Sequence, residues 1–167
     1  NGGVAGKATL QSGTTIYTVT FVTSEGVGTG LSITSVDLTA GPYMANGVSE
    51  NIQMVSGVPA RMQILVPGET AVPGKWNETP YGKTGLPDGN GNNGDGIQAF
   101  TAGIEFTITV RACDINWNVT SSTPIVQIIT YDIYDINAYN SDPANFQLAT
   151  TGTMTAKVTF VTADPIL

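Results

Sequence analysis

Apolar and polar residues alternate along most of this chain, and a period of two predicts β-strands rather than helices. Within residues 13–23, Tyr17, Val19 and Phe21 fall on one strand face, which is the apolar one. The clearest alternation covers residues 104–112, which we expect to form a strand. Its inward row is predicted to be Ile104, Phe106, Ile108, Val110 and Ala112, and its outward row Glu105, Thr107, Thr109 and Arg111. Further strands are predicted at residues 31–38, 61–66, 124–131 and 153–162.

A long stretch without periodicity separates two of these strands. Residues 67–103 are rich in Gly, Pro and Asn and predict an irregular loop. A loop of that length in a compact domain is usually functional or tied down. Short strands separated by turns predict an antiparallel sandwich of two sheets.

The segment VTFVT occurs twice, at residues 19–23 and 158–162. A Gly-Thr pair precedes each copy at the same spacing, as Gly13-Thr14 and Gly152-Thr153. The chain therefore resembles one period of a repeat plus an overlap of about one or two strands.

Composition narrows the class of protein. Of 167 residues, 41% are hydrophobic and only 11% are charged, which favours a folded all-β chain over a disordered one. With 6 basic and 13 acidic residues the net charge is −7 and no basic cluster occurs, so nucleic-acid binding is not expected. No apolar run is long enough to span a membrane as a helix.

The residue inventory also argues against catalysis. The chain has no histidine, which excludes Ser-His-Asp, Cys-His and histidine-ligated metal chemistry. Nothing in the spacing pairs two acidic residues across a cleft, so we do not expect an enzyme. Cys113 is the single cysteine, so no intrachain disulfide can form.

Three motifs occur in an informative order: Pro-Gly-Glu-Thr at residues 67–70, Gly-Lys-Thr-Gly at 82–85, and Asp-Ile-Asn-Trp-Asn at 114–118. In this order they resemble the immunoglobulin-like tandem repeats of large bacterial surface and extracellular proteins. The resemblance covers residues 58–130 well and the flanks more loosely. It implies an immunoglobulin-like antiparallel β-sandwich with an elaborated Gly/Asn-rich loop, at a secreted or cell-surface location. The insertion at residues 88–96 and Cys113 depart from the pattern.

The duplicated strand then indicates how the chain is organised. In such repeats a strand pair like that of residues 13–37 comes late in the domain, so residues 1–52 are interpreted as late or donor strands and residues 53–167 as the sandwich. The chain is then a window of a longer array, or closes on itself, or donates its N-terminal strands to the next copy. We favour the third, a filament or layer subunit that binds copies of itself. Its expected assembly residues are Val19, Phe21, Val158 and Phe160.

The Gly/Asn-rich loop also suggests an ion. Asp88, Asn90 and Asn92 place oxygen atoms at every second position, as in the first half of a calcium loop, and Asp95 would supply a further acid. Calcium is the one cofactor that the sequence suggests, and a solvated turn is the plain alternative. In a second row, Asp114, Asn116 and Asn118, a corner capped by Asx side chains is the favoured interpretation.

The remaining signals concern glycans. Asn77 and Asn118 begin Asn-x-Thr sequences that predict glycosylation in a secreted protein. Trp76 and Tyr81 lie in the long loop, where exposed rings would contact a glycan or a neighbouring subunit. The alternative function is therefore an adhesive or carbohydrate-binding module with a calcium-stabilised loop.

Overall fold

The computed structural model describes residues 10–24, 30–41, 44–91, 97–132, 134 and 146–163. Within these residues there are strands, turns and extended segments but no helix, and every pair of neighbouring strands is antiparallel. The predicted all-β class is therefore confirmed.

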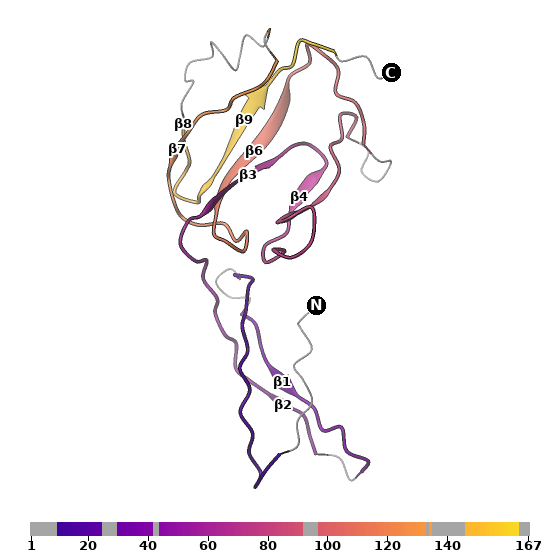
Figure 1. The fold of residues 1–167 in the computed structure, drawn as a ribbon, viewed down its shortest axis with the longest axis vertical. Coiled ribbons are helices and arrows are strands. Elements are labelled where there is room, and N and C mark those ends of the chain that lie inside the picture. The colour runs from indigo at the N-terminus through magenta and orange to yellow at the C-terminus, as the bar shows by residue number, and fades with distance from the viewer. Residues whose placement is uncertain are drawn as a thin grey trace.

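The described chain consists of an extended arm, which contains β1 (Thr34–Ser35) and β2 (Gly47–Val48), and a compact head, which contains the strands from β3 (Arg61–Leu65) to β9 (Thr153–Val158) (Figure 1). In the arm, β1 (Thr34–Ser35) pairs with β2 (Gly47–Val48), and Leu31 bridges Ile52. Residues 10–24 run along the arm from its far end to the base of the head (Figure 1).

Three strands make the main sheet of the head. β6 (Phe106–Cys113) lies in the centre, with β3 (Arg61–Leu65) on one side and β9 (Thr153–Val158) on the other. Its register pairs Ile64 with Val110 and Phe106 with Val158. β6 has the longest alternation of the strands. It therefore presents a long apolar face to the core, and its two edges pair with β3 and β9.

The core lies on the face of the sheet that the alternation predicted. Its buried residues are Ile108, Val110, Ala112, Leu148 and Val158. Ile104 was expected to point inward, but β6 begins only at Phe106 and the Ile104 side chain is 62% exposed. Alternation cannot locate the end of a strand, because it says nothing about where pairing partners stop.

Arg111 was expected to face outward with Glu105, Thr107 and Thr109, but its side chain is buried. It is only 9% exposed, and its Nη1 donates to Gln63 Oε1 at 2.8 Å. Gln63 Nε2 in turn donates to the Gly82 main-chain oxygen at 2.8 Å. The segment containing Gly82 thus covers this end of the outer face, and the guanidinium keeps a buried partner there.

That segment belongs to a hairpin within the stretch expected to be irregular. β4 (Glu69–Ala71) pairs with β5 (Lys83–Gly85), and Lys83 Nζ forms a 2.6 Å ion pair with Glu69 Oε1. Pro67 and Gly68 make the turn into β4, with Gly68 at φ +88° and Glu69 N donating to Val66 O at 3.0 Å. Proline followed by glycine is the usual chemistry of such a turn.

The second layer over the core is narrow. It contains β7 (Ile125–Val126) paired with β8 (Phe146–Gln147), each of two residues. Val126, Ile128 and Phe146 pack against the core from this side. Among the described residues, these two short strands do not cover the three-stranded sheet completely.

Candidate functional site

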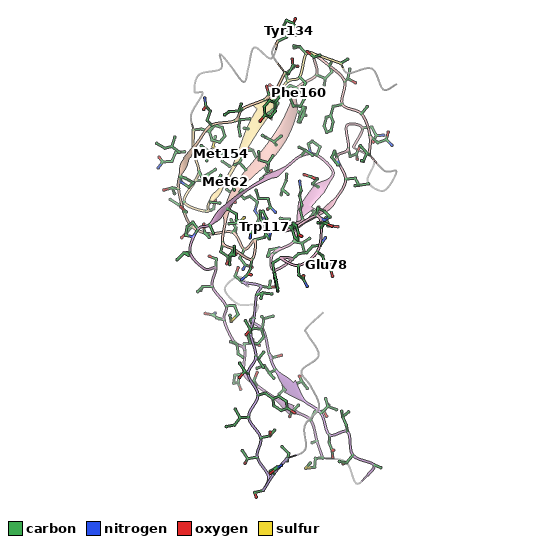
Figure 2. All side chains as sticks on the ribbon, viewed as in Figure 1. Met62, Glu78, Trp117, Tyr134, Met154 and Phe160 are labelled. Carbon is green, nitrogen blue, oxygen red and sulfur yellow. The ribbon has the colours of Figure 1, made fainter. Side chains whose placement is uncertain are left out.

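A groove of about 680 Å³ lies over the uncovered part of the inner face, between the main sheet and residues 128–134. Its floor is formed by apolar side chains of the main sheet and its continuations: Ile64, Val66, Phe106, Ile108, Val158 and Phe160. Phe160 lies in the part of the head remote from the arm, whereas Trp117 lies toward the arm (Figure 2).

Two aromatic side chains of this floor, Phe106 and Phe160, form a row of ring contacts with Phe100, which lies outside the groove lining. The Phe106 ring lies 4.5 Å from that of Phe100 and 5.6 Å from that of Phe160, centroid to centroid, with tilted planes. Tilted contacts at these separations are favourable for aromatic pairs. An apolar or aromatic side chain that entered the groove would extend this row.

The outer wall of the groove is formed by the chain that follows β7. Ile128, Ile129 and Tyr131 line the groove but form no hydrogen bond within the described residues. Unpaired backbone at the margin of a sheet presents donors and acceptors to any strand that comes alongside. The wall therefore offers main-chain pairing above an apolar floor.

Asp132 fastens this wall to the floor at one end. Its Oδ2 accepts hydrogen bonds from Val161 N at 2.7 Å and Thr162 N at 2.8 Å, and its Oδ1 accepts one from the Thr162 hydroxyl at 2.7 Å. The bonds from the Thr162 main chain and side chain lower the pKa of Asp132 to about 2, so the carboxylate is charged at neutral pH.

The arm carries the complementary feature. Residues 15–21 are extended but pair with no strand, and none of them forms a hydrogen bond within the described residues. Ile16 is 91% exposed and Val19 is 44% exposed. The strand predicted here is therefore extended in shape but forms no ladder with any strand of the described residues.

Asn118 fixes the end of this segment to the base of the head. Its Nδ2 donates to Val22 O at 2.8 Å, and its Oδ1 accepts from Ser24 N at 2.7 Å. Gly74 lies so close to Thr23 that a Cβ on Gly74 would collide with the threonine hydroxyl. Residues 22–24 are thus held tightly, whereas residues 15–21 are not.

Asp114 organises the corner behind Asn118. Its carboxylate accepts hydrogen bonds from Gly57 N, Asn116 N, Asn118 N and Asn118 Nδ2, all between 2.8 and 2.9 Å. Burial raises the pKa of Asp114, but these bonds, from the Asn118 side chain first, outweigh it and hold the pKa below its ordinary value. The Asx-capped corner interpretation of this row is confirmed.

The four expected assembly residues fall on the two features described above. Val158 and Phe160 line the groove, and Val158 is buried in the core. Val19 belongs to the unpaired arm segment, and Phe21 ends it beside the tethered residues. One chain therefore places one copy of VTFVT in the floor of a groove and the other in an exposed arm.

The residues expected to bind calcium are only partly described. Asp88 is 4% exposed, and its Oδ1 accepts hydrogen bonds from Asn90 N and Gly91 N, both at 2.9 Å. Its Oδ2 is buried and has no hydrogen-bond partner. Asn92 and Asp95 lie outside the described residues, and no group of three potential metal-ligating side chains (His, Cys, Asp or Glu) occurs within them.

The expected glycan residues differ in their surroundings. Asn77 is exposed, next to Trp76 and near Tyr81, whose rings are also exposed in the loop between β4 and β5. Asn118 is buried, and both hydrogens of its Nδ2 are donated within the corner. A glycan on that nitrogen would require these bonds to be broken.

The strand predicted at residues 124–131 contains the wall of the groove, although β7 itself covers only Ile125–Val126, and neither the wall nor Asp132 was predicted to belong to a site. A signal was present in the apolar run at residues 125–131, which ends at an aspartate. Its contact with Val161 and Thr162 joins residues far apart in the chain, and no local pattern reports such a contact.

No family model, no curated protein and no solved structure matches the chain. Among the described residues, no helix has the length and apolar character needed to cross a membrane.

Proposed function

We propose that this protein is a structural subunit of a secreted or surface-displayed filament or layer, in which copies assemble head to tail by β-strand complementation. One observation carries the proposal: a single chain has an open apolar groove in its head and an unpaired, exposed apolar segment in its arm. A contiguous apolar surface that is exposed to solvent is typical of an interaction site.

The position of the two features favours a chain of subunits over a closed pair. The groove lies in the head and reaches the end remote from the arm (Figure 2). A contact between two different surfaces repeats from one copy to the next, so it generates an open filament or a ring.

The free energy gained by inserting the arm segment into the groove is large enough to support assembly. Fully burying a side chain such as Val or Phe contributes about 1.5–3 kcal/mol relative to leaving it exposed. Tyr17 and Val19 are only half-exposed in the arm, so each would add part of that amount on insertion. New ladder hydrogen bonds would add about 0.5–1.5 kcal/mol each. Several such contributions together offset the entropic cost of association.

The finer description of the fold belongs to the same proposal. An immunoglobulin-like sandwich whose second layer lacks a strand accounts for the three-stranded main sheet, the two short strands opposite it and the groove between them. A secreted location agrees with the exposed sequon at Asn77 and the low content of charged residues.

Electron microscopy and light scattering of the purified full chain test this function. We expect ordered polymers whose mass grows with protein concentration. A chain that stays monomeric at high concentration and unfolds cooperatively would contradict the proposal.

A second function is favoured by a different observation. Trp76 and Tyr81 expose 53% and 47% of their surface in one loop, and exposed rings in such a loop are a usual platform for sugar rings. In this alternative the chain is an adhesive module. A glycan array would identify the ligand, and Trp76→Ala should abolish the signal while Val55→Ala, at another exposed apolar residue, should preserve it.

Calcium bound by the expected residues Asp88, Asn90, Asn92 and Asp95 would support either function by stabilising the folded chain. The unpartnered Oδ2 of Asp88 fits a cation, because a buried carboxylate oxygen without a partner is unfavourable. We expect calcium to raise the melting temperature and Asp88→Asn to remove that rise. A melting temperature indifferent to calcium and to chelator would exclude a structural ion.

A further inference from the structure

We propose that the strand that completes the head is residues 15–21 of a second copy, lying in the second layer beside residues 128–131, with Tyr17, Val19 and Phe21 toward the groove floor. The inference rests on the proposed self-assembly and names its donor, its acceptor and the buried face of the donor. Seven residues in a strand extend about 23 Å, the length of an ordinary strand of a sandwich.

In the part of the head that the structure describes, no strand lies where the donor would lie. The wall residues Ile128, Ile129 and Tyr131 have no hydrogen bond within the described residues, and the floor beneath them is apolar. A strand beside this wall would pair with its main chain and cover Phe106 and Phe160. Addition of a strand to an unpaired edge is a recurrent mode of recognition.

The donor has the side-chain pattern that this position requires. Tyr17, Val19 and Phe21 alternate with Thr18 and Thr20. In the outer layer of a sandwich one strand face is buried and the other meets water. The apolar row would continue the aromatic row of the floor, and the two threonines would remain in solvent.

The donor must come from another copy. Val22 and Ser24 are bound by Asn118 at the base of the head, and the chain runs from there away from the head into the arm (Figure 1). The groove floor reaches Phe160, which lies on the side of the head remote from the arm (Figure 2). A neighbour's segment can enter the groove while its own Asn118 tether stays intact.

Matched variants separate the acceptor from the rest of the sheet. Ile64 and Met62 share one face of β3 and are 45% and 44% exposed, but only Ile64 lines the groove. We expect Ile64→Asp to prevent polymerisation and Met62→Asp to permit it. Phe160→Asp, in the groove, and Ile104→Asp, at an exposed residue outside it, provide a second such pair in case Ile64→Asp fails to fold.

The donor is tested in the same way. Val19→Asp should prevent polymerisation, whereas Val36→Asp, at another exposed valine of the arm, should not. A mixture of Ile64→Asp and Val19→Asp chains gives the decisive result. Each is expected to be monomeric alone, and together they should form a heterodimer that grows no further, because it has one intact donor in one intact acceptor.

The orientation of the donor is read from thiol protection. On assembly, the rate at which the thiol of Val19→Cys reacts with a thiol reagent should fall by a factor of about ten or more. The rate for Thr20→Cys, at the adjacent residue, should not change. Native Cys113 is buried and is distinguished by peptide mapping. Equal protection at both positions would overturn the assigned face.

The outcomes distinguish the two proposals. If the unaltered chain does not polymerise, the structural function falls and this inference falls with it. If it polymerises but Ile64→Asp and Val19→Asp also polymerise, or their mixture gives no heterodimer, the donor and acceptor are wrong while the structural function stands.

Discussion

Asn118 and Val22 are joined by a 2.8 Å hydrogen bond from the side-chain Nδ2 to the main-chain oxygen, across 96 positions of sequence. The same amide accepts a bond from Ser24 N, so one buried side chain fixes the junction of arm and head. Strand exchange needs such a fixed point, because a donor that swings freely loses more entropy on insertion.

Replacing Asn118 should therefore loosen the junction. Asn118→Ala removes the bonds to Val22 and Ser24 and leaves Asp114 with one donor fewer, so we expect a loss of about 1–3 kcal/mol in the free energy of unfolding. Urea denaturation measures this loss, and faster proteolysis near residues 22–24 would locate it. Asn116→Ala, whose side chain makes no such bond, is the control and should be nearly neutral.

Acid should weaken the fastening of the groove wall. The folded-state pKa of Asp132, about 2, lies below its ordinary value of 3.8. A lowered pKa stabilises the folded state fully above the ordinary value, and this contribution is lost as the pH falls through about 2. Asp132→Asn should thus be less stable than the unaltered chain at neutral pH, and the difference should vanish at about pH 2. A difference that is independent of pH would contradict the role of the carboxylate.

Removing the buried Gln63 side chain, which binds Arg111, should lower the free energy of unfolding more than removing an exposed amide side chain. Gln63→Ala leaves the buried Arg111 guanidinium without its partner, although the Gly82 oxygen keeps its hydrogen bond from Val72 N, so we expect a loss of about 2–3 kcal/mol in the free energy of unfolding. The Gln147 side chain also donates to a main-chain oxygen, that of Thr123, but it is exposed. Gln147→Ala should lose less than about 1 kcal/mol, and equal losses would show that burial is not the cause.

Alanine substitutions at two glycines distinguish the cost of backbone strain from the cost of a steric collision. Gly103 and Gly152 both have positive φ, +79° and +67°. A Cβ on Gly103 meets open space, so Gly103→Ala should cost only the left-handed conformation, about 1–2 kcal/mol. A Cβ on Gly152 would collide with the Thr120 main-chain oxygen, so Gly152→Ala should lower the melting temperature much further.

How far the sequence predicted this protein depends on whether the deciding contacts are local. The strands β3, β6 and β9 were predicted, and Ile108 and Val110 were placed on the buried face, because alternation along one strand records its two environments. The hairpin of β4 and β5 was missed, because strands of three residues are too short to show a period.

The sequence by itself determined the all-β class, the inner face of β6 and the turn at Pro67-Gly68, since each follows from residues adjacent in the chain. Only the tertiary structure decided that Arg111 is buried, that residues 15–21 form no ladder with the other described residues and that a groove lies over Phe106 and Phe160. Those outcomes depend on which distant segments cover a given face or edge. Alternation shows that a face is apolar, but it does not show what covers it.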